Sequence, residues 1–208
     1  MIRFAGLDLS PTGSGAATID LSSDGARPLI RCTRFSRPSM PRTATLDERH
    51  ARQRVLAREI CEWVMGPGLD SALCLALESP AYGAGFEAGA HDRSGLWWRV
   101  VGLAYGVAAQ HVVEVNPSTL KAYATGNGRA DKATMIAAAR TRYGGTAALS
   151  HDEADALHLA GMAAHAAGVP VHMGEMSARS LKFLTHPNWP LHLLAKAVQQ
   201  TTTHSRQE

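Results

Sequence analysis

The sequence contains only three cysteines, Cys32, Cys61 and Cys74, and none of them belongs to a C-x-x-C pair. An odd number of widely separated cysteines indicates neither a disulfide framework nor a thiolate zinc site. Such cysteine usage is typical of a reducing compartment, so we expect a cytoplasmic protein.

Long hydrophobic runs are also missing. No apolar stretch reaches the roughly 20 residues that cross a bilayer, so we expect no membrane partner. The first three residues lead at once into a strand pattern, which leaves no room for a signal peptide.

Net charge is small as well. A value of +3 over 208 residues does not by itself indicate a nucleic-acid partner, and the 45% hydrophobic content is ordinary for one domain with a core. The charge is unevenly distributed, however. Nine arginines lie between residues 27 and 58, and this arginine block either lines a phosphate-binding surface or forms a solvated face.

The first third of the chain predicts a three-stranded meander and a helix. Residues 3–10, 14–19 and 29–35 have strand patterns separated by turn residues. A proline-rich connector at 36–43 leads to a helical spacing of apolar residues at 46–64.

The rest of the chain predicts alternating strands and helices. A continuous apolar run at 72–77 has the length of a buried strand. The other expected elements are a mobile glycine-rich segment at 79–95, helices at 96–110, 117–123, 131–143 and 150–168, a strand at 112–115, and a short amphipathic helix at 190–200. This order is typical of an α/β fold with a mixed five-stranded sheet flanked by helices.

The helix at 150–168 places two carboxylates on one face. Ser150 and Glu153 fit a capping box, and Gly168 is a suitable C-terminal stop. Asp152 and Asp155 are three residues apart, so they share a face beside an apolar stripe. They either complement the positive end of the helix dipole or belong to a site that binds a cation.

Two further carboxylates end predicted strands, namely Asp8 and Glu78. Strand ends and helix starts converge in α/β sheets, so we expect these two residues to meet Asp152 and Asp155. Burying such acids is costly unless they bind something, and oxygen ligands suit Mg²⁺ or Mn²⁺. Two such ions form the usual centre for phosphodiester cleavage. Alternatively, Asp8 bonds the turn that follows it and Glu78 is exposed at its strand end.

The chain contains, in this order, the stretches GLDLSPTGSG, LALESP, NPSTLKAYATGNGRADKATMIAAA and DEADAL. Together they resemble the RuvC family of Holliday junction resolvases from bacteria and bacteriophages. The resemblance covers about residues 2–168 and implies a ribonuclease H-like nuclease domain, a homodimer, and Mg²⁺- or Mn²⁺-dependent nicking of four-way junctions. Residues 169–208 have no counterpart, and we expect a C-terminal extension that is partly helical and then disordered.

By position, the resemblance assigns catalytic and metal-binding roles to four carboxylates: Asp8, Glu78, Asp152 and Asp155. Lys121 and Lys132 match two lysines that the family uses at the DNA backbone. Because they flank a glycine-rich loop, they could move onto a scissile phosphate, and Arg129 in that loop is a further phosphate candidate. The alternative is that all three are ordinary exposed cations.

The sequence departs from the family pattern at two places. The family's Asp-Pro-Gly after the first strand is replaced by residues 8–13, DLSPTG. The glutamine and aromatic residue that follow the second carboxylate are replaced by residues 79–81, SPA. Tyr82 or Phe86 could instead stack on an unpaired base at the junction centre, or either could pack within its own loop.

The helix at 96–110 is apolar almost all round, which a peripheral helix does not tolerate in water. Gly102 and Gly106 would allow a partner helix to approach closely. A two-fold dimer would match the two equivalent strands of a four-way junction. The helix could instead be buried within its own subunit.

These observations predict a metal-dependent, structure-selective endonuclease that cleaves Holliday junctions and related branched DNA and leaves 5′-phosphate ends. Three alternatives stay open. One is a broader debranching nuclease that also cuts flaps and forks, and another is a catalytically weak module that binds branched DNA. The third is an actin-like sugar kinase, because Asp8 with Thr12 and Gly13 faintly resembles a phosphate-binding hairpin.

Overall fold

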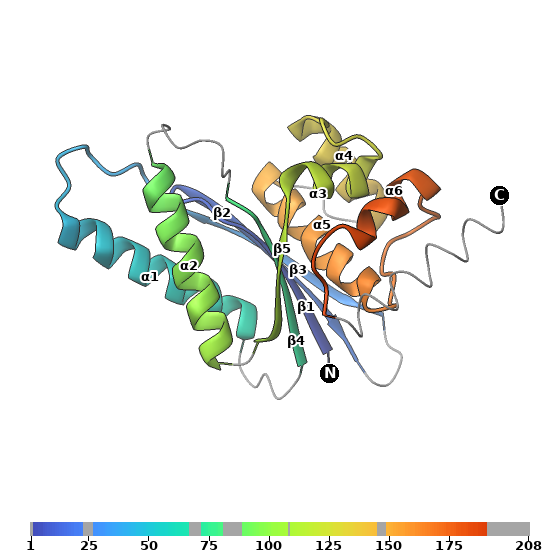
Figure 1. The fold of residues 1–208 in the computed structure, drawn as a ribbon, viewed down its shortest axis with the longest axis horizontal. Coiled ribbons are helices and arrows are strands. Elements are labelled where there is room, and N and C mark those ends of the chain that lie inside the picture. Colours follow the sequence, from blue (N-terminus) through green and yellow to red (C-terminus); the bar gives the residue numbers. More distant parts are fainter. Residues whose placement is uncertain are drawn as a thin grey trace.

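The computed structural model describes residues 2–22, 27–66, 72–80, 89–107, 109–144 and 149–190. Within these residues, one sheet has the strand order β3-β2-β1-β4-β5 (Figure 1). Its strands are β1 (Ile2–Asp8), β2 (Gly13–Leu21), β3 (Leu29–Ser36), β4 (Ala72–Glu78) and β5 (Ala109–Val115). The first three pair antiparallel, whereas β4 pairs parallel with both β1 and β5. The expected meander and mixed five-stranded sheet are therefore confirmed.

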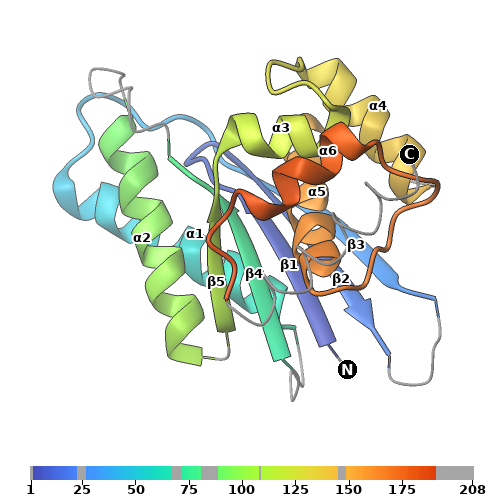
Figure 2. The same ribbon diagram turned by 45° about the vertical axis from the view of Figure 1, so that its right-hand side comes forward.

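Helices cover both faces of this sheet (Figures 1 and 2). One face carries α1 (Leu46–Met65) and α2 (Ala90–Val107), which close the smaller of two hydrophobic clusters. The other face carries α5 (His151–Ala166) and the larger cluster, with α3 (Pro117–Thr125) and α4 (Lys132–Tyr143) beside it. Strands β1 and β4 are buried between the two helical layers, which explains why the sequence of β4 is apolar throughout.

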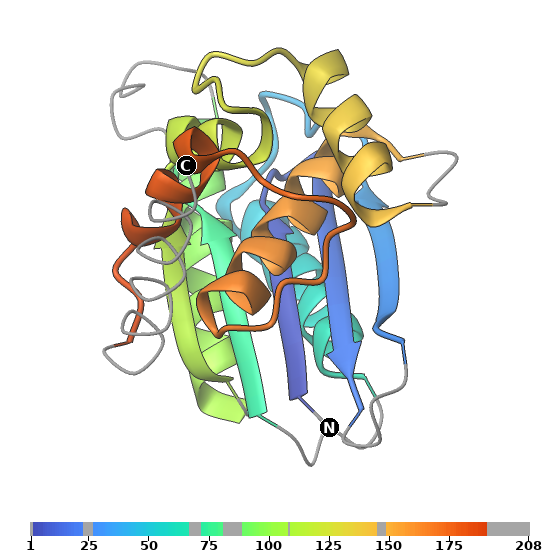
Figure 3. The ribbon, with the colours of Figure 1, turned by 90° about the vertical axis from the view of Figure 1, so that its right-hand side faces the viewer.

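Helix α5 lies directly on the sheet because two strand residues lack side chains. A Cβ atom on Gly6 would lie 2.0 Å from the carbonyl oxygen of Ala156, and one on Gly15 would lie 1.9 Å from that of Asp152. Figure 3 shows α5 crossing obliquely over the strands. Gly15 therefore fixes where the first turn of α5 lies above the sheet, and Gly6 does the same for the turns that follow.

The ends of α5 are formed as the sequence indicates. Ser150 and Glu153 make both halves of a capping box, with the backbone N of Ser150 donating to Glu153 Oε2 at 2.9 Å. At the other end, Gly168 has a φ of +85° and its N–H donates to the carbonyl oxygen of His165. Only a residue without a Cβ adopts this left-handed conformation without strain, so the helix stops there.

Two expectations about α2 are wrong. The helix begins at Ala90, within the segment expected to be a glycine-rich loop, and residues 109 and 110 belong to β5 rather than to the helix. Gly95, which ends the segment predicted to be a glycine-rich loop, lies inside α2. A Cβ there would meet Gln53 Oε1 of α1 at 2.8 Å, so this glycine serves the close packing of the two helices.

The described part of the C-terminal extension packs against the larger cluster. It contains α6 (Ala178–Lys182) and a short 3-10 helix (Phe183–Thr185), neither of which the sequence pattern indicated. The side chains that it buries in this cluster are Met176, Leu181, Leu184 and Trp189. The helix expected at 190–200 and the disorder expected at 201–208 lie outside the described residues, apart from residue 190. In the part of the chain that the structure describes, no helix is long and apolar enough to span a membrane.

Candidate active site

The register of the sheet brings the two strand-end carboxylates together. Because β1 and β4 are parallel and Leu7 pairs with Leu77, Asp8 and Glu78 leave the sheet at the same edge on neighbouring strands. On its other side, Asp8 pairs with Gly15, and the backbone of Asp152 lies directly over that glycine. The first turn of α5 is thus placed above the end of β1.

All four carboxylates line one cleft with a volume of about 480 Å³. The side chain of Asp152 is 8% exposed, and the other three acids are only partly accessible. The cleft is therefore a place where several negative charges share a poorly hydrated space.

This crowding raises the pKa of three of the four groups. Burial and the neighbouring Asp155 and Asp152 raise the pKa of Asp8 to about 7. Burial, Asp8 and Asp155 raise the pKa of Glu78 to about 8. Burial is also the main reason that the pKa of Asp155 rises to about 6, although Lys121 opposes it. These carboxylates are held close together in a dry site without enough positive charge to compensate them.

Two of the carboxylates have little bonding of their own. Asp155 Oδ1 is buried and has no hydrogen-bond partner within the described residues. The carboxylate of Asp8 makes no hydrogen bond there either, and the turn after it is held by Ser14, whose hydroxyl donates to the carbonyl oxygen of Ser10 at 2.8 Å. The alternative that Asp8 serves to bond its own turn therefore has no support in this structure.

Asp152 is bonded differently, because it carries two ionic contacts. Its Oδ2 lies 2.6 Å from Arg34 Nε, and its Oδ1 lies 2.6 Å from His151 Nδ1. Among the described residues, no three carboxylate, imidazole or thiol groups are close enough together to form a complete ligand set. The carboxylates all line one cleft, but Oδ2 of Asp152 is turned toward Arg34.

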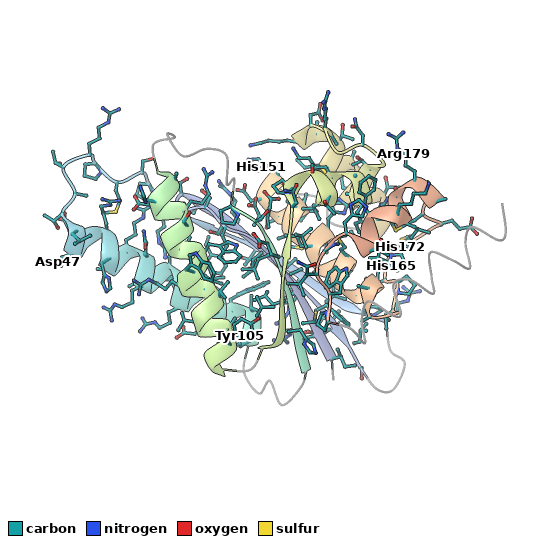
Figure 4. All side chains as sticks on the ribbon, viewed as in Figure 1. Asp47, Tyr105, His151, His165, His172 and Arg179 are labelled. Atoms are coloured by element: carbon teal, nitrogen blue, oxygen red, sulfur yellow. The ribbon has the colours of Figure 1, made fainter. Side chains whose placement is uncertain are left out.

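Positive side chains surround the carboxylates. Lys121 on α3 and Lys132 on α4 both line the cleft. Lys132 Nζ lies 3.1 Å from His151 Nε2, and the His151 ring in turn contacts Asp152. His151 sits at the start of α5 (Figure 4), where a ring protonated on Nδ1 would donate to Asp152 and accept from Lys132.

Four residues that line this cleft were not predicted as site residues from the sequence: Arg34, Arg93, Trp97 and His151. Arg34 was only one member of the arginine block. Arg93 and Trp97 lie in α2, and Trp97 donates from its indole N–H to the backbone carbonyl of Glu78 at 3.0 Å. His151 had a detectable signal, because it directly precedes the acidic pair.

Of the other three predicted DNA-binding residues, the structure describes one. Arg129 is exposed in the loop between α3 and α4 and does not line the cleft. Tyr82 and Phe86 lie outside the described residues.

Sequence comparison finds a relative that matches somewhat less than half of the chain. Residues covering 45% of this chain are 41% identical, over 100 residues, to the crossover junction endodeoxyribonuclease RuvC of Anaeromyxobacter dehalogenans. The matched region spans 52%, about half, of that relative's length. No family model matches the chain.

Comparison of structures shows the fold. The RuvC structure from Thermus thermophilus matches with a TM-score of 0.54 and 21% identity, over 76% of this chain and 91% of that one. The structure of T. thermophilus RuvC in complex with Holliday junction substrate matches with a TM-score of 0.52 and 20% identity, over 77% and 91% of the two chains. The ribonuclease H-like fold is therefore confirmed, as is the resemblance to the RuvC family of Holliday junction resolvases.

Proposed function

We propose that this RuvC-like chain is a divalent-metal-dependent endonuclease that cleaves Holliday junctions and related branched DNA and leaves 5′-phosphate ends. The observation that carries this proposal is the meeting of Asp8, Glu78, Asp152 and Asp155, from three separate parts of the chain, in one cleft. The sequence likeness to a crossover junction endodeoxyribonuclease supports the same activity.

The four carboxylates are the groups that would hold Mg²⁺ or Mn²⁺, as two ions in one site. Hard oxygen donors suit these ions, and the unpartnered Oδ1 of Asp155 is a donor in need of a positive neighbour. When bound, the ions supply Lewis acidity that favours attack by water and stabilises the leaving oxygen. Their charge would also oppose the raised pKa values of Asp8 and Glu78, so binding would release protons.

The cations of the cleft would bind and orient the DNA. Lys121 and Lys132 face the carboxylates from α3 and α4, where they can contact the non-bridging oxygens of the scissile phosphate. Contact with His151 limits the freedom of the long Lys132 side chain. Arg129 lies outside the cleft and would contact a phosphate farther along the backbone.

The protein would act as a homodimer through α2. The outer face of this helix exposes Trp98 (65% exposed) and Tyr105 (60% exposed), and no atom lies within 4 Å of a Cβ placed on Gly102 or Gly106. Figure 4 shows Tyr105 projecting near the end of the helix. An apolar face with small residues at its centre suits a second copy of the same helix.

Two further proposals concern segments beside the cleft. Tyr82 or Phe86 would stack on a base at the junction centre. Residues 1–168 would form the nuclease domain, because every residue that lines the cleft precedes residue 168. The extension after it would support that domain through its buried side chains.

The experiment that tests the activity uses labelled junction, flap, fork and duplex DNA in Mg²⁺, with Asp8→Asn as the inactive control. Cleavage of the junction in preference to duplex supports the proposal, and equal cutting of flaps and forks would favour the broader debranching nuclease. Tight binding without cleavage would favour a DNA-binding module. A rise in melting temperature with ATP, without DNA cleavage, would favour the kinase.

A further inference from the structure

A second cleft lies next to the carboxylate cleft, on the other side of the turn between β1 and β2. Its volume is about 440 Å³. Its walls come from that turn, from residues 39–42, and from the first turns of α1 and α2. Ser10, Thr12 and Arg93 line both clefts, so the two are neighbours that share one wall.

The second cleft is strongly cationic. Four arginines line it, Arg42, Arg49, Arg52 and Arg93, against the single carboxylate of Asp92. Arg49 Nη2 lies 2.5 Å from Asp92 Oδ1, so that pair is neutralised. The other three arginines have no carboxylate partner in this cleft wall, but Arg93 also faces the first cleft, where its charge lowers the pKa of Asp8 and Glu78. Arg42 and Arg52 are therefore the two cations that no carboxylate of either cleft compensates.

These three guanidinium groups have few partners. Arg52 donates from Nη2 to the carbonyl oxygen of Pro11 at 2.7 Å, but its Nε is buried and has no acceptor in the described part of the chain. The guanidinium groups of Arg42 and Arg93 make no hydrogen bond or short ion pair with any described residue, although the backbone N–H of Arg93 donates to the carbonyl oxygen of Gly89. Native structures rarely leave a buried donor unsatisfied, so the Nε of Arg52 indicates that an acceptor belongs in this cleft. Arg42 is exposed, so its guanidinium is free to bind an anion from solvent.

The shared wall favours a nucleic-acid strand as the ligand of the second cleft. A strand whose phosphate lies among the carboxylates of the first cleft would pass Ser10 and Thr12 and enter the second, where its next phosphates would meet Arg93, Arg52 and Arg42. Planar guanidinium groups bind phosphate oxygens with paired hydrogen bonds. A small free anion would not need a cleft of this size with several separate cations.

We propose that this second cleft binds the phosphodiester backbone of the strand being cut, on one side of the scissile phosphate. The inference rests on the proposed nuclease function. It states which surface the substrate strand contacts beside the carboxylate cleft. Arg52 would then have two roles, because the same guanidinium that meets the backbone holds Pro11 three residues after Asp8.

The test compares Arg42→Gln and the double variant R42Q/R52Q with the parental protein. Arg54→Gln is the matched control, because Arg54 lies on α1 with Arg52, is exposed and lines neither cleft. The dissociation constant for a four-way junction is measured without divalent metal over a range of salt concentrations. We expect Arg42→Gln to weaken binding about threefold to tenfold and to reduce the slope of log K against log[salt] by roughly 0.7–0.9 for the lost phosphate contact. Arg54→Gln should match the parental protein within about twofold.

A second set of junctions is shortened on one side of the scissile phosphate at a time. The loss of affinity in R42Q/R52Q should disappear when the DNA flank that enters the second cleft is removed. It should persist when the other flank is removed. Equal affinities and slopes for R42Q/R52Q and Arg54→Gln would overturn the inference. A loss of affinity that persists after removal of either flank would also overturn it, because that loss would reflect the lower net positive charge of the variant and not a contact in the cleft.

This design separates the inference from the proposed function. Parental protein that binds junctions but does not cut them in Mg²⁺ contradicts the nuclease proposal, while the binding comparison still decides the role of the cleft. Parental protein that cuts junctions, with R42Q/R52Q binding as tightly, contradicts the cleft alone. Parental protein that binds no DNA contradicts both.

Discussion

The guanidinium of Arg34 holds the carboxylate of Asp152, with Nε 2.6 Å from Oδ2. Arg34 lies on β3 and Asp152 on α5, so the pair joins the antiparallel part of the sheet to the helix above it. The contact also gives one of the four acids a positive partner that a metal ion would have to replace or share. Arg34 therefore acts as an internal competitor for the proposed metal site.

Removing this competitor should strengthen metal binding. We expect Arg34→Gln to lower the Mg²⁺ concentration for half-maximal junction cleavage by about threefold to tenfold, because a neighbouring cation repels a metal ion and occupies a ligand oxygen. Arg37→Gln is the control, since Arg37 pairs with Glu59 outside the cleft. A higher Mg²⁺ requirement in Arg34→Gln would show that the arginine supports the metal site instead.

The adjacent acids Asp152 and Glu153 should have separate roles. Asp152 faces the cleft, whereas Glu153 Oε2 accepts from the Ser150 backbone and hydroxyl as half of the capping box. Asp152→Asn should reduce cleavage by roughly a thousandfold, in keeping with the loss of an essential catalytic group. Glu153→Gln can still cap the helix and should cut within about threefold of the parental rate.

Cleavage over a Mg²⁺ titration, with thermal melting as the folding control, distinguishes these two variants. An inactive Glu153→Gln beside an active Asp152→Asn would mean that the wrong acid has been placed in the site.

The two cleft lysines should contribute through phosphate. Lys121→Gln and Lys132→Gln should each slow cleavage by about tenfold or more and reduce the salt dependence of DNA binding by roughly one phosphate contact. Lys182→Gln on α6 lines neither cleft and serves as the control. If both cleft variants cut at the parental rate at every salt concentration, these lysines have no role in catalysis.

His158 should make stability depend on pH. It is fully buried, its Nε2 lies 3.1 Å from the carbonyl oxygen of Met135, and burial lowers its pKa to about 4. The unfolded chain takes up this proton near pH 6.5 but the folded chain only near pH 4, so the stability present above pH 6.5 is lost as the pH falls between these values.

The comparison is with His158→Gln, measured by urea denaturation at pH 7 and pH 4. Relative to that variant, the parental protein should lose up to about 3 kcal/mol of unfolding free energy over this interval. An identical pH dependence for the two proteins would contradict the burial of a neutral imidazole.

The sequence was most informative where periodicity and caps agree with packing. The meander, the apolar strand β4 and the capping box of α5 are all local patterns, and each formed where expected. The start of α2 was missed because Gly95 resembles a loop residue, while its function is to let α1 approach. The two short helices of the extension were not predicted, because they depend on packing against a core made by distant residues, as the burial of Trp189 shows.

The site was predictable in its carboxylates but not in its cations. Acids at strand ends and in a first helical turn have a recognisable placement, whereas nine arginines in one block look alike. The structure separates them by contact: Arg34 joins the carboxylates, Arg31 pairs with Asp20, and Arg42 and Arg52 line the second cleft. Which arginine goes where depends on strand register and helix packing, and these are properties of the whole fold.

The central claim is that the four gathered carboxylates form the metal-dependent nuclease site, and Asp155 is its most exacting position because its Oδ1 is buried without a described partner. The most direct measurement is the rate of nicking of a synthetic four-way junction by the parental protein and Asp155→Asn, each with Mg²⁺ and with a chelator. We expect the parental protein to cut only with Mg²⁺ and the variant to be slower by about a thousandfold while melting normally. Cutting that persists in the chelator, or an Asp155→Asn variant as fast as the parental protein, would contradict the claim.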